Sequence, residues 1–174
     1  QTNLKRMLAY SSVGQVGFLL MGVAALSTLS SNGLMVHLVG YSVTNLAVFF
    51  AITAFYNVTG KEEIADFAGL AARSPFLAAA ITVSLFSLAG LPFLAGFVTK
   101  FYLFSAAAAE DLLWLAGVAM VASLISLYYY LKVIREMYIS PVAEGEGGII
   151  QIPSILYGLV GILVIFVILL GVYP

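Results

Sequence analysis

Five long apolar segments constrain the fold of this chain more than any other feature. A membrane-crossing helix needs about 20 mostly apolar residues, because the hydrocarbon layer is about 30 Å thick and a helix rises about 1.5 Å per residue. Five stretches meet this requirement, and turn-forming or charged residues separate them, at 8–27, 34–56, 75–108, 112–138 and 152–173. The pattern predicts an all-α, polytopic transmembrane helix bundle that forms a single membrane domain over residues 1–174.

The composition excludes several other classes of protein. Hydrophobic residues make up 63% of the chain and charged residues 9%, which leaves too little polar surface for a domain in water. The net charge of -1 gives no basic field for nucleic acid, so lipid is the expected surrounding. With no cysteine and one histidine, we expect no metal site and no cofactor within this chain.

The basic residues predict an orientation, because short cytoplasmic loops are enriched in lysine and arginine. Five spans force successive loops onto alternating sides of the membrane. Six basic residues then share one side, and the opposite loops carry none; the six are Lys5, Arg6, Lys61, Arg73, Lys132 and Arg135. We expect a multi-pass membrane protein whose chain starts in the cytoplasm.

The seventh basic residue, Lys100, departs from this pattern. It lies nine residues before Ala109, which corresponds to about 13 Å of helix. A charge inside the hydrocarbon layer is costly, so such a residue usually faces the protein interior and marks an ion pathway. The alternative is that its aliphatic stem carries the ammonium to the membrane interface.

The same segment contains a predicted break at Gly90–Gly96. Pro92 removes a backbone donor, and Gly90 and Gly96 relax the backbone, so two half-helices are expected in place of one long helix. Irregular backbone at membrane depth is tolerated where it is buried in protein or lines a watery cavity. An ordinary proline kink is the alternative.

A buried lysine beside such a break favours proton transfer. Desolvation favours the neutral form of an amine, so a nearby change of charge can make it gain or lose a proton. Polar side chains able to hold water are expected close by, among them Ser84 and Ser87 on the same segment and Gln15 on the first.

Several motifs resemble one known family. Lys5-Arg6-Met7-Leu8-Ala9-Tyr10-Ser11-Ser12 followed by Gln15-Val16-Gly17-Phe18 is similar to a signature of the antiporter-like subunits of respiratory complex I. Later motifs resemble the N-subunit branch of NADH:quinone oxidoreductase in particular; they are Asp66-Phe67-Ala68-Gly69-Leu70, Arg73-Ser74-Pro75, Ser87-Leu88-Ala89-Gly90-Leu91-Pro92, Gly96-Phe97-Val98-Thr99-Lys100-Phe101-Tyr102 and Tyr128-Tyr129-Tyr130-Leu131-Lys132.

The resemblance implies a proton-translocating subunit of a bacterial inner-membrane complex. In that family two inverted repeats each contain a broken helix, and buried lysines and a glutamate form a proton path. Lys100 matches the lysine of the second broken helix, at the outward side. NAD, FMN, iron–sulfur clusters and quinone are implied in other subunits, with the other membrane subunits and lipid as partners.

Some positions depart from the family or lie outside its motifs. Gln15 stands where many relatives have histidine, although its amide can still orient water. His37 matches no family role, and we expect it to be an interfacial histidine. The Glu-Gly-Glu-Gly-Gly run at 144–148 predicts a flexible, solvated loop. The chain lacks an initiator methionine and ends directly after an apolar segment, so we expect a piece of a longer protein.

Three functions are therefore weighed. The first is a proton-translocating membrane subunit of NADH:quinone oxidoreductase, with Lys100 as proton relay and no redox centre of its own. The second is a subunit of a multisubunit cation/proton antiporter or membrane-bound hydrogenase. The third is a scaffold bundle that conducts nothing, in which Lys100 is permanently paired or faces lipid headgroups.

Overall fold

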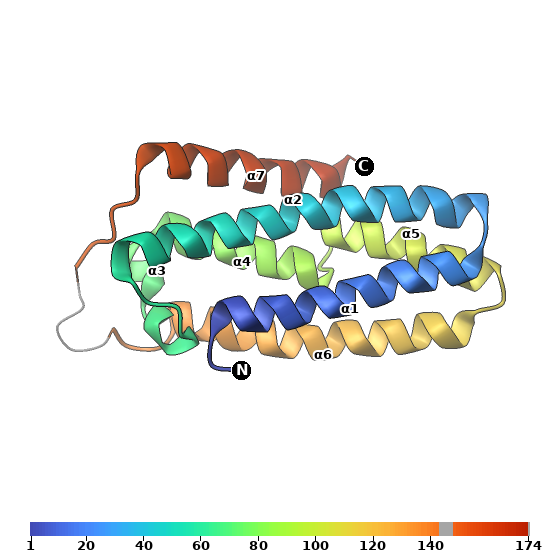
Figure 1. Ribbon diagram of the computed structural model, residues 1–174, viewed down its shortest axis with the longest axis horizontal. Coiled ribbons are helices and arrows are strands. Elements are labelled where there is room, and N and C mark those ends of the chain that lie inside the picture. Colours follow the sequence, from blue (N-terminus) through green and yellow to red (C-terminus); the bar gives the residue numbers. More distant parts are fainter. Residues whose placement is uncertain (143–147, 174) are drawn as a thin grey trace.

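A computed structural model describes residues 1–142 and 148–173, so most of the predicted loop at 144–148 lies outside the described residues. The chain folds into helices that lie side by side in one bundle (Figure 1). In chain order they are α1 (Leu4–Ala25), α2 (Thr28–Thr59), η1 (Ile64–Phe67), α3 (Leu70–Arg73), α4 (Pro75–Ala89), α5 (Ala95–Ala109), α6 (Leu113–Tyr138) and α7 (Ser154–Val172).

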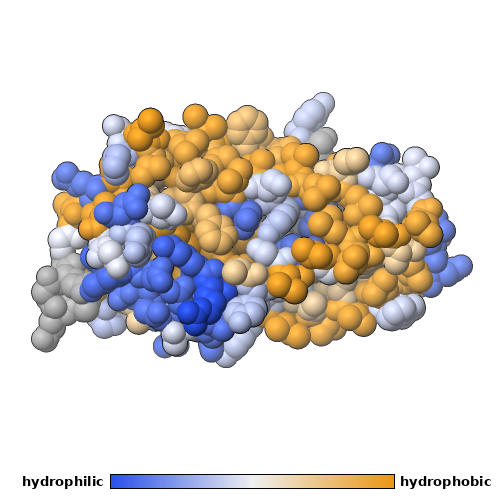
Figure 2. Space-filling model, in the orientation of Figure 1, coloured by the Kyte–Doolittle hydropathy of each residue, from blue (hydrophilic) through white to orange (hydrophobic). Residues whose placement is uncertain are grey.

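The predicted class, a polytopic helical membrane bundle, is confirmed. Within the described ranges, α1, α2, α6 and α7 are long and apolar enough to cross a membrane, and α4 and α5 are shorter apolar helices of 15 residues each. Hydrophobic surface covers much of the face seen in Figure 2, with hydrophilic surface gathered toward the end where α1 begins. That the chain forms a single domain stays a prediction.

The first connection is shorter than the sequence predicted. The first two predicted spans leave residues 28–33 between them as a connection, yet α2 already begins at Thr28. The Ser27 side chain caps this helix by accepting a hydrogen bond from the Ser30 amide at 3.2 Å. A capped N-terminus stabilises the first turn, so serine-rich sequence continues as helix instead of loop.

The break in the third apolar segment is confirmed, because α4 ends at Ala89 and α5 begins at Ala95. Gly90 ends α4 with φ +90, a conformation that glycine adopts without steric cost. Gly96 lies inside the first turn of α5 and not in the break itself. A Cβ at Gly96 would overlap the Ser87 carbonyl oxygen, so Gly96 permits the two half-helices to approach closely.

The two half-helices occupy the interior of the bundle. Long helix α2 packs against α1, α4, α5 and α7, and α6 packs against α1, α4 and α5. Two clusters of buried hydrophobic residues fill the space between them. The larger cluster includes Leu8, Ile52, Phe55 and Leu85, and the smaller one is made of Phe18, Met21, Leu103, Ala107 and Ala116.

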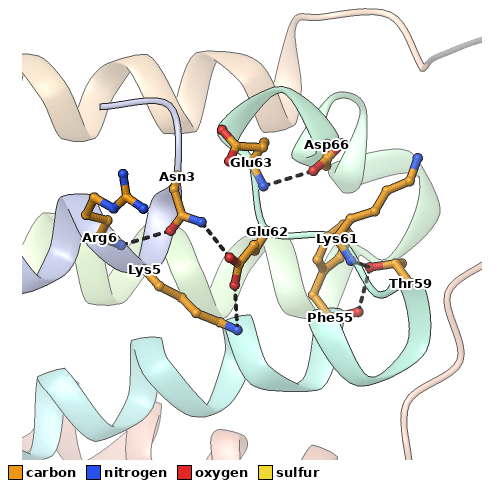
Figure 3. A network of polar contacts seen from close by, with 9 residues as sticks. All are labelled: Asn3, Lys5, Arg6, Phe55, Thr59, Lys61, Glu62, Glu63 and Asp66. Carbon is orange, nitrogen blue, oxygen red and sulfur yellow. Dashed lines mark hydrogen bonds and ion pairs between the residues drawn. The ribbon is translucent and has the colours of Figure 1, made fainter.

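One end of the bundle carries the six basic residues predicted to share a side, and we call it the basic end. Here the chain start pairs with the segment after α2: the Asn3 amide donates to the Glu62 carboxylate at 2.7 Å, and Lys5 forms an ion pair with Glu62 at 2.9 Å (Figure 3). Asn3 also caps α1 by accepting from the Arg6 amide at 3.0 Å. The opposite end, with the connections after α1 and α5, is called the far end.

Candidate functional site

Lys100 lies in the interior of the bundle, on the second turn of α5, with 3% of its surface exposed. Its Nζ donates hydrogen bonds to the carbonyl oxygens of Leu88 at 2.8 Å and Ala89 at 3.2 Å. A third bond reaches Ser123 Oγ of α6 at 3.2 Å. The side chain therefore points back across the helix break and does not extend to an interface.

The two carbonyls that hold Lys100 belong to the end of α4. The last carbonyls of a helix lack partners within the helix and carry its partial negative charge. The Gly90 amide donates to the carbonyl oxygens of Phe86 and Ser87. The carbonyl oxygens of Leu88 and Ala89 are therefore left to accept from side-chain donors. The broken helix thus creates an acceptor site that a continuous helix would not provide.

Glycine at position 90 and phenylalanine at position 18 complete the surroundings of the ammonium. A Cβ at Gly90 would lie 3.2 Å from Lys100 Cδ, so the glycine leaves room for the lysine stem. Lys100 Nζ also lies 4.5 Å from the centre of the Phe18 ring, within range of a cation–π interaction. A cavity of about 270 Å³ borders Lys100 and is lined mainly by apolar side chains of α5 and α6.

Gln15 is brought to the same place as Lys100. Its side-chain amide donates to the Leu88 carbonyl at 3.3 Å, so Gln15 and Lys100 share one acceptor. Only 3% of the Gln15 surface is exposed. An amide in this position has further hydrogen-bonding capacity beside the lysine.

The two predicted serines contribute differently. Ser84 donates to the Ala80 carbonyl of its own helix at 2.8 Å, which uses its proton locally. Ser87 accepts a hydrogen bond from the Gly96 amide at 3.0 Å and lies 3.1 Å from Thr44 Oγ1 of α2. Ser87 thus joins α4, α5 and α2 at the break. Pro92 lies in the exposed turn between the half-helices.

The expectation of an interfacial His37 is wrong, since only 1% of its surface is exposed. His37 Nδ1 lies 3.0 Å from Thr99 Oγ1, and the Thr99 hydroxyl donates to the Gly96 carbonyl at 3.2 Å. The hydrogen-bond pattern therefore assigns the imidazole proton to Nδ1. Nε2 is buried and has no hydrogen-bond partner among the described residues.

Sequence reasoning did not identify His37, Thr99 or Ser123 as neighbours of the break. One signal was present for His37: it shares a helix face with Gly33, Gly40 and Thr44, and small residues at that spacing mark a closely packed face. Within the described part of the chain, no three His, Asp or Glu side chains gather as a metal site would require.

The chain is similar to known membrane proteins in sequence and in fold. A family model described as NADH:quinone oxidoreductase/Mrp antiporter, TM, matches residues 1–126. Subunit N of NADH-quinone oxidoreductase from Moorella thermoacetica is 45% identical over the whole chain, and the corresponding subunit from Heliobacterium modesticaldum is 42% identical. The chain spans 36% of the length of each of these relatives.

Solved structures share the fold. The chain superposes over its full length on a chain of respiratory complex I from Thermus thermophilus with bound NADH, with a TM-score of 0.89, 27% identity and coverage of 36% of that chain. A chain of the Mrp complex from Dietzia sp. has a TM-score of 0.87 over 98% of this chain and 40% of its own length. At 24% identity, the Mrp similarity indicates the fold alone.

Proposed function

We propose that this chain, which belongs to the NADH:quinone oxidoreductase/Mrp antiporter membrane family, forms part of a proton path in the membrane arm of an NADH:quinone oxidoreductase. Lys100 is the group that gains and loses the proton. Gln15 orients water beside it, and Ser84 and Ser87 are polar groups along the path. Gly90, Pro92 and Gly96 maintain the helix break that holds the lysine.

The observation that carries this proposal is the way the Lys100 ammonium is held. Its hydrogen-bond acceptors are two backbone carbonyls and one hydroxyl, and no carboxylate pairs with it among the described residues. After losing a proton, the neutral amine can still donate to the same carbonyls, and no buried carboxylate is left unpaired. The two protonation states therefore differ less in free energy than those of a paired lysine.

A small electrostatic change is then sufficient to move the proton. A unit charge about 8 Å away contributes about 2 kcal/mol at an effective dielectric constant of about 20. About 1.4 kcal/mol changes proton occupancy tenfold. Redox-driven movement of a charge in a neighbouring part of the membrane arm would therefore be enough to load or unload Lys100.

The electron-transfer groups of such an enzyme, NAD, FMN, iron–sulfur clusters and quinone, are assigned to other subunits. The partners of this chain are the other membrane subunits and lipid. The proposed location is the bacterial inner membrane, with the basic end in the cytoplasm because short cytoplasmic loops are enriched in lysine and arginine.

The test uses the assembled complex in sealed vesicles. Lys100→Met should abolish most proton pumping and lower coupled quinone reductase activity, because methionine fills a similar volume but binds no proton. Lys61→Met, at a partly exposed lysine of the basic end that lines no part of the Lys100 surroundings, is the matched control and should pump normally. Unchanged pumping and reductase activity in Lys100→Met would overturn the relay, and a more stable complex with full activity would support the scaffold function.

The family description also names Mrp antiporters, which makes cation/proton exchange the second candidate. The same vesicles distinguish the two functions. Replacing sodium by choline should leave pumping unchanged if Lys100 serves proton translocation alone. A sodium gradient that drives proton movement, lost in Lys100→Met, would favour the antiporter.

A further inference from the structure

Between α1, α5 and α6, apolar side chains separate Lys100 from the far end of the bundle. The smaller hydrophobic cluster begins at Phe18, whose ring contacts the Lys100 ammonium, and continues through Leu103 and Ala107 on the same helix as the lysine. The partly buried side chains packed against this cluster are also hydrophobic; they are Leu34, Phe104, Leu112, Leu115 and Ala119. A proton that moves from Lys100 toward the far end through this cluster therefore meets no hydrogen-bonding side chain.

The basic end differs, because a cavity of about 450 Å³ opens there between α1 and α6. Its lining includes Ser11 of α1 and Tyr129 and Lys132 of α6. A cavity of this volume with hydroxyl and ammonium groups in its wall is large and polar enough to hold several water molecules.

At the inner side of this cavity, two buried hydroxyls meet. Ser11 Oγ and Tyr130 Oη form a hydrogen bond that joins α1 to α6 across 119 residues of sequence. Ser11 is 6% exposed and Tyr130 is completely buried within the larger hydrophobic cluster. A phenylalanine and an alanine would fill nearly the same volume without burying polar atoms, so packing alone does not account for this pair.

Gln15 continues the line from the hydroxyl pair to the lysine. It lies four residues after Ser11 on the buried face of α1, a rise of about 6 Å. A water molecule hydrogen-bonded to both side chains would bridge a gap of that size. The Gln15 amide in turn donates to the Leu88 carbonyl that also accepts from Lys100. Hydrogen-bonding groups therefore extend from the cavity to the lysine.

We propose that protons reach Lys100 from the basic end, through the cavity, the Ser11–Tyr130 hydroxyl pair and Gln15. This inference rests on the proposed function of Lys100. In each transfer, a hydroxyl oxygen accepts a proton from the cavity side and releases its own proton toward Gln15, so Ser11 and Tyr130 return unchanged. The water between the hydroxyl pair and Gln15 takes up this proton and passes one of its own to a second water, which the Gln15 amide holds beside Lys100. The second water protonates the neutral Lys100 amine, which becomes the ammonium, and both waters return unchanged.

Paired substitutions in the assembled complex test this route. Ser11→Ala and Tyr130→Phe should each slow proton pumping several-fold, and the loss should grow as the pH on the basic-end side rises and proton supply becomes limiting. The double variant should be no slower than the slower single variant, because both interrupt one route. Ser12→Ala and Tyr128→Phe are the matched controls, since Ser12 donates to its own helix and Tyr128 is exposed.

The outcomes separate this inference from the proposed function. Normal pumping in Lys100→Met would mean that the proposed function itself fails. The route alone would be overturned by a different result. In that result Lys100→Met stops pumping, while Ser11→Ala and Tyr130→Phe pump as well as the controls at every pH.

A second measurement does not depend on the stability of these variants. The chain has no cysteine, so Ser11→Cys places one thiol in it. A membrane-impermeant, negatively charged methanethiosulfonate should modify this thiol from the basic-end side of oriented vesicles and stop pumping. Modification from the far side only, or from neither side, would overturn the route.

Discussion

Glu62 shows how single charges act at the basic end. It accepts hydrogen bonds from Lys5 and Asn3, so it ties the beginning of α1 to the segment after α2 (Figure 3). These two hydrogen bonds, that of Lys5 first, lower the pKa of the Glu62 carboxyl below its ordinary value of 4.5. The folded protein therefore holds the carboxylate form more strongly than the unfolded chain does.

The sign of the pH dependence follows from this lowered pKa. The contribution of Glu62 to stability is complete above pH 4.5 and is lost as the pH falls through the lower value of the folded state. Glu62→Gln should thus lower the midpoint of thermal unfolding near neutral pH, and the difference from the unsubstituted protein should shrink below pH 4.5. Glu110→Gln, in the exposed far-end connection, is the control and should change neither value. A difference that stays constant into acid would contradict the assignment.

Lys100 illustrates what could be predicted for a single residue. Its burial was predictable, because an apolar segment without neighbouring charges leaves an ammonium inside the hydrocarbon. Its acceptors were not, because backbone carbonyls occur at every residue and no pattern marks the ones left free at Leu88 and Ala89. The acceptors depend on how two half-helices approach one another.

The helix break depends on close contact between α4 and α5 and on support from α7. Gly96 touches the Ser87 carbonyl, and a Cβ at Gly171 near the end of α7 would overlap the Leu94 backbone. Helix α7 thus packs against the turn between the half-helices, where Phe93 has φ +68. Glycine at both contacts lets three elements meet at one place.

Gly96→Ala should disturb the break because its methyl group cannot fit beside Ser87. Overpacking of this kind costs about 1 to 3 kcal/mol, and the shift of α5 should move Lys100 away from the α4 carbonyls. We expect a lower midpoint of thermal unfolding and weaker proton pumping. Gly17→Ala, where a Cβ meets nothing within 4 Å, is the control and should be as stable as the unsubstituted protein or more so. Equal stability of the two variants would contradict the close contact.

At the scale of the whole molecule, the bundle gathers its basic residues at one end. The six basic residues other than Lys100 lie on or beside the ends of helices at the basic end, whereas the far-end connection after α5 carries Glu110 and Asp111 and no basic residue. Helices α6 and α7 expose most of their apolar side chains, as expected of surfaces that meet lipid or other helices.

This separation predicts the orientation of the chain in the membrane. In oriented vesicles, Lys61→Cys should react with an impermeant thiol reagent from the cytoplasmic side, and Asp111→Cys from the opposite side, because cytoplasmic connections are the basic ones. Both variants replace an exposed or partly exposed charged residue, so they serve as controls for each other. Reaction of both from one side, or with the sides reversed, would contradict the orientation.

The sequence by itself determined the membrane class, the break at Gly90 and the isolation of Lys100, because hydropathy and backbone preferences act over a few residues. Tertiary structure alone decided what surrounds the lysine. The contact of Ser11 with Tyr130 spans 119 residues and that of Gln15 with Leu88 spans 73. Such pairs form when helices pack, and their polar atoms meet only because α1, α4 and α6 enclose one buried space.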